Sequence, residues 1–320
     1  MAKPTLSVVI PVRNGGEKFR RCLQSVTVAK PPPDELIVVD DGSTDNSASL
    51  AETFGAKVIR LAETGGPARA RNTGAHAASG DVLVFFDADV AVAPDALAEI
   101  VAAWEREPDI GAVFGSYDDA PAEPNFLSQY KNLFHHYVHQ ISREEASTFW
   151  AGCGAVRREL FLAVGGFDES YRQPSIEDIE LGYRLRRAGH RIRLVKTLQV
   201  KHLKRWTARS LLYADFWLRA VPWTELILRD RRMLNDLNLT WKARVAVALA
   251  WLALAALVVG LWWLALPALV GMLATHTGLL SFFLAKRTVP FTLAAMFWIW
   301  LYNLYSGLGF AVGLVRHWMR

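Results

Sequence analysis

The chain has 320 residues, 52% hydrophobic and 21% charged; this composition excludes a disordered protein, and the length allows one large domain or two ordinary ones. The formal net charge of +5 is unevenly placed, because all 31 acidic residues lie at or before Asp236 and only six of the 36 Lys and Arg lie beyond it. The basic excess therefore belongs to a segment almost without charge, which excludes the basic folded face of a nucleic-acid binder.

The N-terminal part alternates short apolar runs rich in β-branched residues with stretches typical of helices. Strands are predicted over 6–12, 35–40, 57–61, 82–86 and 111–115, and helices over 17–29, 44–54, 68–77 and after Pro94. This alternation predicts an α/β fold with a mostly parallel, doubly wound sheet, which binds ligands at the carboxyl ends of its strands. Since the start of the chain leads directly into the first strand, we expect no signal peptide and a cytosolic domain.

Acidic residues follow two of the predicted strands. Asp40 and Asp41 end the second strand, and Asp87, Ala88 and Asp89 follow the fourth. Such carboxylates repel one another unless a hard cation such as Mg²⁺ or Mn²⁺ lies between them. Alternate residues of an extended backbone share a face, so the last pair could hold a diphosphate through that cation. An ordinary acidic turn at a strand end is the structural alternative.

Two later segments have both a functional and a structural interpretation. Gly152, Cys153 and Gly154 could let the backbone approach an acceptor closely, or could form a tight turn before a strand. The two cysteines are too few for a disulfide framework or a zinc site and are expected to be buried thiols. Residues 125–142 predict an amphipathic helix whose three histidines are expected on a partly exposed face rather than at a metal.

Seven segments, in chain order, resemble the motifs of the family-2 glycosyltransferases, which have the GT-A fold. They are VVIPVRN (8–14), VVDDGSTD (38–45), GGPARARNTGA (65–75), GDVLVFFDADV (80–90), GGFDE (165–169), IEDIELGYRLRRAG (176–189) and HLKRW (202–206). The resemblance implies inverting transfer of a sugar from a nucleotide diphosphate sugar with one divalent metal, Mg²⁺ or Mn²⁺. It covers about the first two thirds of the chain.

The same resemblance implies a donor site at the strand ends. Asp41, or alternatively Asp40, would accept a hydrogen bond from the base, and Arg71 would lie near the donor phosphates or the base. Asp87 would contact the ribose or the metal, and Asp89 would ligate the metal. The expected lining of the nucleoside pocket is Pro11, Val12 and Arg13, and Ala88 is counted with the donor site.

The resemblance also implies that Asp178 is the catalytic base, with Glu177 beside it. A base must accept the proton of the acceptor hydroxyl, and an unperturbed Asp is too weak for this. Neighbouring carboxylates, Glu177 and Glu180, and partial burial should therefore raise its pKa. The structural alternative is an acidic cluster at a helix N-terminus, with Ser175 as a possible cap, and both interpretations can hold together.

The HLKRW segment departs from the Gln/Arg-x-x-Arg-Trp pattern of processive family members, which argues against a polymerising enzyme. His202 could be a further metal ligand, a cap or a phosphate contact. Arg205 suits a diphosphate, and Trp206 would offer a flat face to a sugar or acceptor.

The rest of the chain predicts a membrane segment. No charged residue occurs from Val245 to Ala285 or from Thr288 to Val315, and ten of the twelve Trp lie at or after Trp206. We expect three crossings, at about 243–266, 267–285 and 289–315, with the first break at Pro267; a buried hairpin of a soluble protein is the alternative. The aromatic and Arg-rich stretch 206–230 predicts amphipathic helices in the headgroup region.

The expected organisation is a glycosyltransferase domain at 1–203, interface helices at 204–240 and a transmembrane domain at 241–320. The interpretation is an enzyme of glycolipid biosynthesis in the inner (plasma) membrane, multi-pass, with its catalytic domain in the cytoplasm. It would move a sugar from a UDP-sugar, or alternatively a GDP-sugar, to a lipid or lipid-linked acceptor, with membrane lipids but no nucleic acid as partners. The rival hypotheses are a processive polysaccharide synthase and a non-catalytic nucleotide-binding scaffold; the oligomeric state is left open.

Overall fold

The computed structural model of the protein describes residues 3–319. They form two compact units with separate cores. The sheet unit comprises the residues up to Pro124 and Arg143–Arg205, and the helical unit comprises Asn125–Ser142 and the residues from Trp206 onward. The division after Arg205 lies close to the predicted boundary at 203, but the structure assigns the insertion 125–142 to the helical unit rather than to the first domain.

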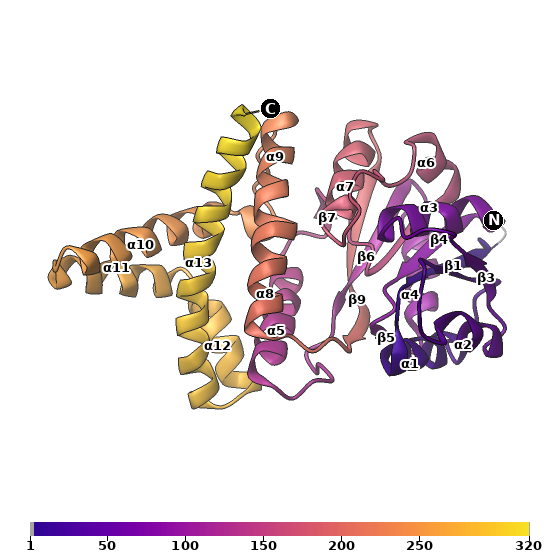
Figure 1. Cartoon of the computed structure of the whole chain (residues 1–320), viewed down its shortest axis with the longest axis horizontal. Helices are drawn as coiled ribbons and strands as arrows, with labels where there is room; N and C mark the ends of the chain where they lie inside the picture. Colours follow the sequence, from indigo (N-terminus) through magenta and orange to yellow (C-terminus); the bar gives the residue numbers. More distant parts are fainter. Residues whose placement is uncertain (1–2, 320) are drawn as a thin grey trace. The chain divides into compact units, whose positions relative to one another are not determined.

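A mixed sheet of nine strands forms the centre of the sheet unit within the described residues (Figure 1). Its strands lie in the order β3-β2-β1-β4-β8-β6-β9-β5, and β7 pairs with β9. Pairing is parallel from β3 to β4, whereas β8 runs antiparallel to both β4 and β6. The strands are β1 (Leu6–Val12), β2 (Glu35–Asp40), β3 (Lys57–Arg60), β4 (Val82–Phe86), β5 (Val90–Val92), β6 (Ile110–Tyr117), β7 (Glu145–Ala146), β8 (Cys153–Arg157) and β9 (Arg191–His202).

Helices cover both faces of this sheet, as the doubly wound prediction required. Phe19 of α1 and Leu97 of α4 pack in the core on one face, and Phe161 of α6 and Leu181 of α7 pack in the core on the other. The helices are α1 (Gly16–Thr27), α2 (Ser47–Thr53), α3 (Pro67–Ala77), α4 (Ala96–Arg106), α6 (Arg158–Ala163) and α7 (Glu177–Arg187). The α/β fold class is therefore confirmed.

The five predicted strands all run in the same direction, as predicted, but the structure adds antiparallel strands that were not predicted. The fifth predicted strand lies within β6, and antiparallel β8 (Cys153–Arg157) lies between β6 and β4. Strand order reverses at β1, which has β2 on one side and β4 on the other. The carboxyl ends of β1 and β4 thus flank the point at which such sheets bind ligands.

The helical unit consists of helices without a sheet among the described residues. The insertion helix α5 (Phe126–Ile141) packs in the core of this unit with Phe283 and Ile299. After Trp206 a nearly continuous helix contains α8 (Ala208–Asp215), the π-helical turn η1 (Phe216–Ala220) and α9 (Val221–Arg229). The remaining elements are η2 (Leu237–Leu239), α10 (Trp241–Val258), α11 (Trp262–Ala274), α12 (Thr277–Lys286) and α13 (Val289–Trp318).

Two helices of the described chain, α10 and α13, are long and apolar enough to cross a membrane, and α11 with α12 would be a third span if the bent pair counts as one. The predicted break at Pro267 is wrong, since Pro267 lies inside α11. The chain turns instead at Gly260, whose φ of 76° is in the left-handed region that glycine adopts easily. The amide of Leu261 donates to the carbonyl of Ala256 and closes α10 there.

A buried ionic cluster joins three helices of the helical unit. Asp215 of α8 accepts hydrogen bonds from Lys131 Nζ of α5 (2.6 and 2.8 Å), from Arg219 Nη1 (3.1 Å) and from the Tyr305 hydroxyl of α13 (2.9 Å). Burial alone would raise the pKa of Asp215, but Lys131 and Arg219 hold it below its ordinary value. The carboxylate is therefore charged and ties α5, α8 and α13 together.

The histidines of α5 correct another expectation. His136 and His139 are buried, and the ring of His136 stacks on Phe282 of α12 at 5.7 Å between centroids. The ring of His135 lies 4.1 Å from that of His139. The predicted partly exposed face is thus largely covered, because helices after Trp206 pack against the insertion.

Candidate active site

The loops after β1 and β2 hold each other in place at the carboxyl edge of the sheet. Asn14 has a left-handed backbone (φ 52°) and its side-chain oxygen accepts the Thr44 amide at 2.7 Å. The Asn14 amide donates to Ser43 Oγ at 2.9 Å, and the Asp41 amide donates to the Val12 carbonyl at 2.9 Å. Pro11, Val12 and Arg13, the predicted lining of the nucleoside pocket, lie on this braced edge, with Arg13 exposed.

Asp40 and Asp41 are both buried and both bind backbone amides. The two oxygens of Asp41 accept from Gly65 (2.7 Å) and Gly66 (2.9 Å), and Asp40 Oδ1 accepts from Ser43 (2.9 Å). A carboxylate oxygen can accept a second hydrogen bond, so either residue can shape this edge and still meet a base.

Arg71 bridges two acidic residues that are far apart in the sequence. Its Nη2 donates to Asp87 Oδ1 at 2.7 Å, and its Nη1 donates to Glu177 Oε1 at 2.8 Å. The guanidinium is 5% exposed and lies over the Phe167 ring at 5.4 Å. Burial alone would lower the pKa of Arg71, but the surrounding carboxylates raise it above its ordinary value. A fixed positive charge therefore lies between the end of β4 and the start of α7.

Asp178 lies in the first turn of α7, next to this ion cluster. Its Oδ2 accepts the Ala151 amide at 3.1 Å and its Oδ1 accepts the Ile179 amide at 2.8 Å. Burial and the neighbouring charge of Glu177 raise the pKa of Asp178 to about 7, against the opposing effect of Arg71. A carboxylate with this pKa is a much better proton acceptor near neutral pH than an ordinary Asp.

Two details of the α7 prediction are wrong. Glu180 does not act as an acidic neighbour of Asp178, because Arg184 holds it in a forked pair at 2.6–2.9 Å. Ser175 does not cap the helix, whose N-cap is Ile176. The Glu177 side chain instead accepts the Ser175 amide at 2.8 Å.

Asp89 and His202 come together from β5 and β9. Register pairs Val90 with His202, and this places His202 Nε2 3.9 Å from Asp89 Oδ2. A divalent ion binds oxygen and nitrogen ligands at about 2.0–2.2 Å, so a small rotation would let one ion contact both atoms. Arg71 holds Asp87 Oδ1, and within residues 3–319 no group of three His, Cys, Asp or Glu is gathered for a metal. Asp89 and His202 thus form a close pair, and the role of Asp87 as a further ligand stays a prediction.

Arg205 and Trp206 differ in environment. The Arg205 side chain is 66% exposed, 3.9 Å from Glu123, and is open to an anionic group. Trp206 is 4% exposed and packs with Leu211 and Tyr305 in the helical unit. The prediction of a flat indole face available to a sugar or acceptor is therefore wrong for this structure.

The 152–154 segment is a tightly packed turn leading into β8. A side chain at Gly154 would lie 2.4 Å from the Trp150 carbonyl and 2.5 Å from the Phe149 ring. Gly152 lies against the Trp150 ring. Cys153 and Cys22 are fully buried free thiols, as expected, so Cys153 offers no side chain to an acceptor. Both glycines are explained by packing, and an acceptor could meet only the backbone or Trp150 here.

The sequence analysis did not single out Tyr117, an aromatic residue, or Asn72, which holds a loop in place. Tyr117 stacks on His202 (4.2 Å between ring centroids, 15° between planes) and meets Trp150 edge-on. Asn72 exchanges hydrogen bonds with the backbone of Phe167 at 2.8 and 2.9 Å, which fixes the GGFDE loop against α3. The dipeptide Arg71–Asn72 was a sequence signal for this role of Asn72. Tyr117 had no such signal, because it meets His202 only through the pairing of β6 with β9.

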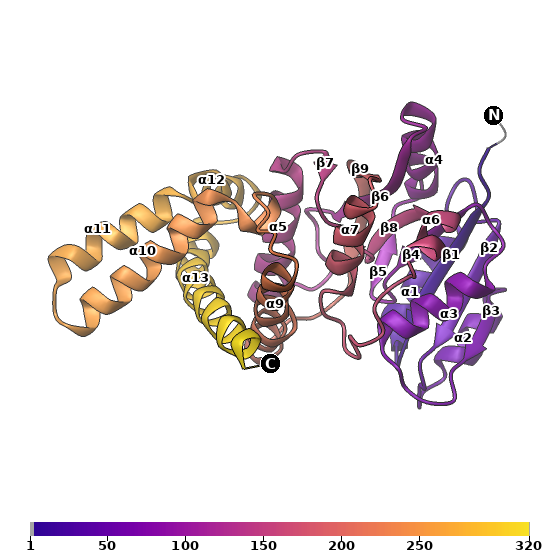
Figure 2. The same cartoon turned by 90° about the horizontal axis from the view of Figure 1, so that it is seen from above.

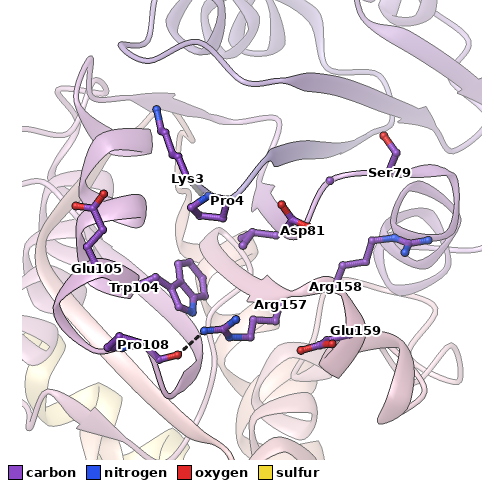
Figure 3. Close-up of a pocket in the computed structure, with 12 residues that line it drawn as sticks. Lys3, Pro4, Ser79, Asp81, Trp104, Glu105, Pro108, Arg157, Arg158 and Glu159 are labelled. Carbon is purple, nitrogen blue, oxygen red and sulfur yellow. Dashed lines mark hydrogen bonds between the residues drawn. The ribbon is translucent and has the colours of Figure 1, made fainter. Parts of the chain in front are cut away.

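A separate hollow of about 680 Å³ lies at the opposite, amino end of β4 (Figure 3). Lys3, Asp81 and Trp104 are among its lining residues, and Arg157 donates to the Pro108 carbonyl at its edge. Cations and carboxylates are mixed there, and none of the predicted site residues lines it. The candidate active site is therefore the carboxyl edge with Arg71, Asp89, Asp178 and His202.

Comparison with known proteins identifies the family of the chain. Residues 7–165 match the model of glycosyl transferase family 2, and residues 133–207 match the N-terminal domain of galactosyltransferase. The pre-mycofactocin glycosyltransferase of Mycobacterium tuberculosis (strain ATCC 25618 / H37Rv) is 30% identical over 224 residues, which are 65% of this chain and 46% of that protein. The chain thus spans about half the length of that relative. The probable glycosyltransferase YdaM of Bacillus subtilis (strain 168) is 24% identical and covers 91% of this chain and 74% of its own length.

A solved structure has a similar fold over nearly the whole chain. The mannosyltransferase PcManGT from Pyrobaculum calidifontis, solved in complex with GDP-Man and Mn2+, has a TM-score of 0.64 at 20% identity, covering 97% of this chain and 88% of that one. At this identity the likeness concerns the fold. Taken with the ordered motifs and the family matches, it leads to one conclusion: the chain belongs to glycosyltransferase family 2 and has the GT-A fold.

Proposed function

We propose that the protein transfers a sugar, with inversion, from a nucleotide diphosphate sugar to a lipid or lipid-linked acceptor at the cytoplasmic face of a membrane. The observation that carries the proposal is Asp178, a carboxylate whose pKa is raised to about 7 beside the Arg71 ion cluster at the carboxyl edge of the sheet. UDP-sugars are the favoured donors and GDP-sugars the alternative.

Asp178 is assigned as the base. Inversion requires that the acceptor oxygen attack the anomeric carbon from the face opposite the diphosphate, while a base accepts its proton. The Ala151 and Ile179 amides orient the Asp178 carboxylate, and Glu177 favours proton uptake. Because Glu177 is also bonded to Arg71, it acts as a positioning residue.

The Arg71 charge helps to hold the donor side in order. Arg71 Nη2 fixes Asp87 just after β4, where Asp87 would contact the ribose or the metal. Asp40 and Asp41 brace the loops beneath the nucleoside, and Pro11, Val12 and Arg13 line them. Exposed Arg205 supplies a cation for the diphosphate as its charge develops.

Asp89 and His202 fit a divalent cation, because an oxygen and a nitrogen ligand face each other at 3.9 Å. When bound there, Mg²⁺ or Mn²⁺ would supply positive charge to the leaving diphosphate. Stacking of the His202 ring on Tyr117 keeps Nε2 directed at Asp89. The Mn2+ in the PcManGT complex supports this cofactor class for the present chain.

The lipid acceptor is inferred from the helical unit. Helices α10 and α13 are long and apolar enough to enter a membrane, and Trp251 of α10 and Trp262 and Trp263 of α11 are exposed. A soluble acceptor would not require such a surface on the enzyme. Cations at the ends of the apolar segments, Lys242 with Arg244 and Lys286 with Arg287, favour the cytoplasmic side.

A direct test uses purified full-length protein with Mn²⁺ or Mg²⁺, a panel of labelled UDP- and GDP-sugars and a membrane lipid extract. We expect label in the organic phase with at least one donor, and loss of that signal when EDTA removes the metal. Label that reaches only water-soluble products would contradict the lipid acceptor. Chains of many sugars, resolved by mass spectrometry, would indicate a processive synthase instead.

A further inference from the structure

The arrangement of α10, α11 and α13 points to a mode of membrane binding that differs from three crossings. Figures 1 and 2 both show the α10–α11 hairpin running across the axis of α13 rather than alongside it. Contacts agree, because Gly307 of α13 meets Val247 and Trp251 of α10, and Trp300 Nε1 donates to the Ala250 carbonyl at 3.3 Å. Helices that cross in this way cannot all stand along the membrane normal.

The tip of the hairpin is exposed and wholly apolar. Alanines facing one another, Ala253 and Ala256 of α10 with Ala265 and Ala268 of α11, are buried along the hairpin. Six large side chains around the turn at Gly260 are each more than half exposed: Leu257, Val258, Val259, Trp262, Trp263 and Leu266. A surface of this kind is suited to hydrocarbon and not to water.

The second arm of the hairpin, α11, is too short to return across a bilayer. At 1.5 Å per residue, the 18 residues of α10 span about 27 Å and the 13 residues of α11 about 20 Å, whereas the hydrocarbon core is about 30 Å thick. Lys242 and Arg244 lie in the first turn of α10, so the part beyond them is shorter still. After Ala274 the chain bends by 67° into α12, which ends at Lys286.

Helix α13 has two different long faces. One carries an exposed apolar stripe: Val289, Leu293, Phe297, Leu308, Val315 and Trp318. On another face, a Cβ at Gly309 would lie 2.6 Å from Ala220 and one at Gly313 would lie 2.6 Å from Thr224, so α13 packs closely against the helix 208–229. Arg316 also pairs with Glu225 of that helix at 3.0 Å. An exposed apolar stripe on one face and a closely packed second face are together typical of a helix that lies in the membrane surface.

Orientation of α13 along the membrane normal would be energetically unfavourable. The helix 208–229 runs parallel to it and carries Asp215, Arg219 and Glu225, so a membrane-spanning α13 would take these charges into the hydrocarbon core. With α13 in the membrane plane, the charges lie on the watery side and the hairpin points into the lipid.

We infer that the helical unit binds one leaflet of an anionic phospholipid bilayer from a single side. The α10–α11 hairpin inserts as a re-entrant wedge that ends inside the bilayer, and α13 lies in the headgroup region with its apolar stripe toward the lipid. The cations at the hairpin base and at the end of α12 meet anionic headgroups. The C-terminal end of α13 therefore stays on the side from which the hairpin enters.

Cysteine labelling of the full-length protein in sealed membrane vesicles tests this inference. The native thiols, Cys22 and Cys153, are fully buried, so single added cysteines report their own position. The three positions are Glu17→Cys on the sheet unit as the reference, Met319→Cys beyond α13 and Trp262→Cys at the hairpin tip; all three native side chains are exposed. Leu257→Cys replaces the tip variant if Trp262→Cys folds poorly.

With a membrane-impermeant maleimide, Met319→Cys should react as fully as Glu17→Cys in the same vesicle orientation, and neither should react in the opposite one. The tip cysteine should react from neither side until detergent is added. Reaction of Met319→Cys only in the opposite orientation, or reaction of the tip from the far side, would overturn the inference.

The inference rests on the membrane association in the proposed function but not on sugar transfer. Protein that fails to float with vesicles containing anionic phospholipid would refute both the inference and the membrane part of that proposal. Transfer itself is measured separately with donor and metal, so the catalytic proposal can fail or stand without deciding the topology.

Discussion

Replacement of Asp178 by Asn is the sharpest perturbation of the proposed chemistry. The amide keeps the size of the side chain and can still accept one of the two backbone hydrogen bonds, from Ala151 or Ile179, but it cannot take up a proton. General-base catalysis contributes about 10²–10⁴-fold, or about 3–5 kcal/mol of barrier. We therefore expect transfer to fall by that factor while donor binding, measured calorimetrically with Mn²⁺, stays within about twofold.

The pH profile provides the second half of this test. Asp178 is active when deprotonated, and its pKa is about 7, so activity should be lost as pH falls through 7. About half of the molecules carry the active form at pH 7 and about a tenth at pH 6, which predicts a tenfold loss of kcat/KM per unit at lower pH. Asp178→Asn should lack this slope. Asp109→Asn, which removes an exposed carboxylate elsewhere, is the matched control. Near-normal transfer by Asp178→Asn, or a flat wild-type profile from pH 8 to 6, would refute the assignment.

Four further substitutions test the ion pairs and the metal pair. Arg71→Met leaves the charges of Asp87 and Glu177 uncompensated and should lower the free energy of unfolding by about 3–5 kcal/mol in urea titrations. Arg69→Met, at an exposed position, is the control and should leave stability unchanged. Equal stability of the two variants would contradict the bridge. Asp89→Asn and His202→Gln should each raise the Mn²⁺ concentration needed for half-maximal transfer at least tenfold. Asp95→Asn, at an exposed position, should not change it. An unchanged metal requirement would exclude Asp89 and His202 as metal ligands. Asp215→Asn removes the buried negative charge that Lys131 and Arg219 face, and it should lower stability by about 3 kcal/mol in thermal unfolding. A smaller loss than for Arg219→Gln would argue against the cluster.

Much of the sheet and its functional edge could be predicted from the sequence, because both depend on local patterns. Runs such as 6–12 and 82–86 are apolar because they are buried on both faces, and turn residues end them. Carboxyl ends of parallel strands meet at one edge, so Asp40, Asp41, Asp87 and Asp89 could be placed there before any coordinates. The pairing of Glu177 with Asp178 likewise predicted a raised pKa at the second of them.

What could not be predicted depends on contacts between distant segments. Strand β8 enters the sheet in the reverse direction, and nothing within Cys153–Arg157 signals which strands it will join. Tyr117 meets His202 through the register of two strands far apart in sequence. Hydropathy measures the length and apolar character of a helix but not its direction. It could therefore not distinguish a helix that crosses the membrane from α13, which runs across the α10–α11 hairpin.

The central claim is metal-dependent transfer of a sugar, with inversion, from a nucleotide diphosphate sugar to a lipid. Its most direct test is the anomeric configuration of the lipid-linked product, determined by NMR after reaction of the full-length protein with a donor of known configuration and Mn²⁺. The account predicts a single organic-soluble product whose anomeric configuration is opposite to that of the donor. A product that retains the donor configuration, or no lipid-linked sugar with any UDP- or GDP-sugar, would contradict it.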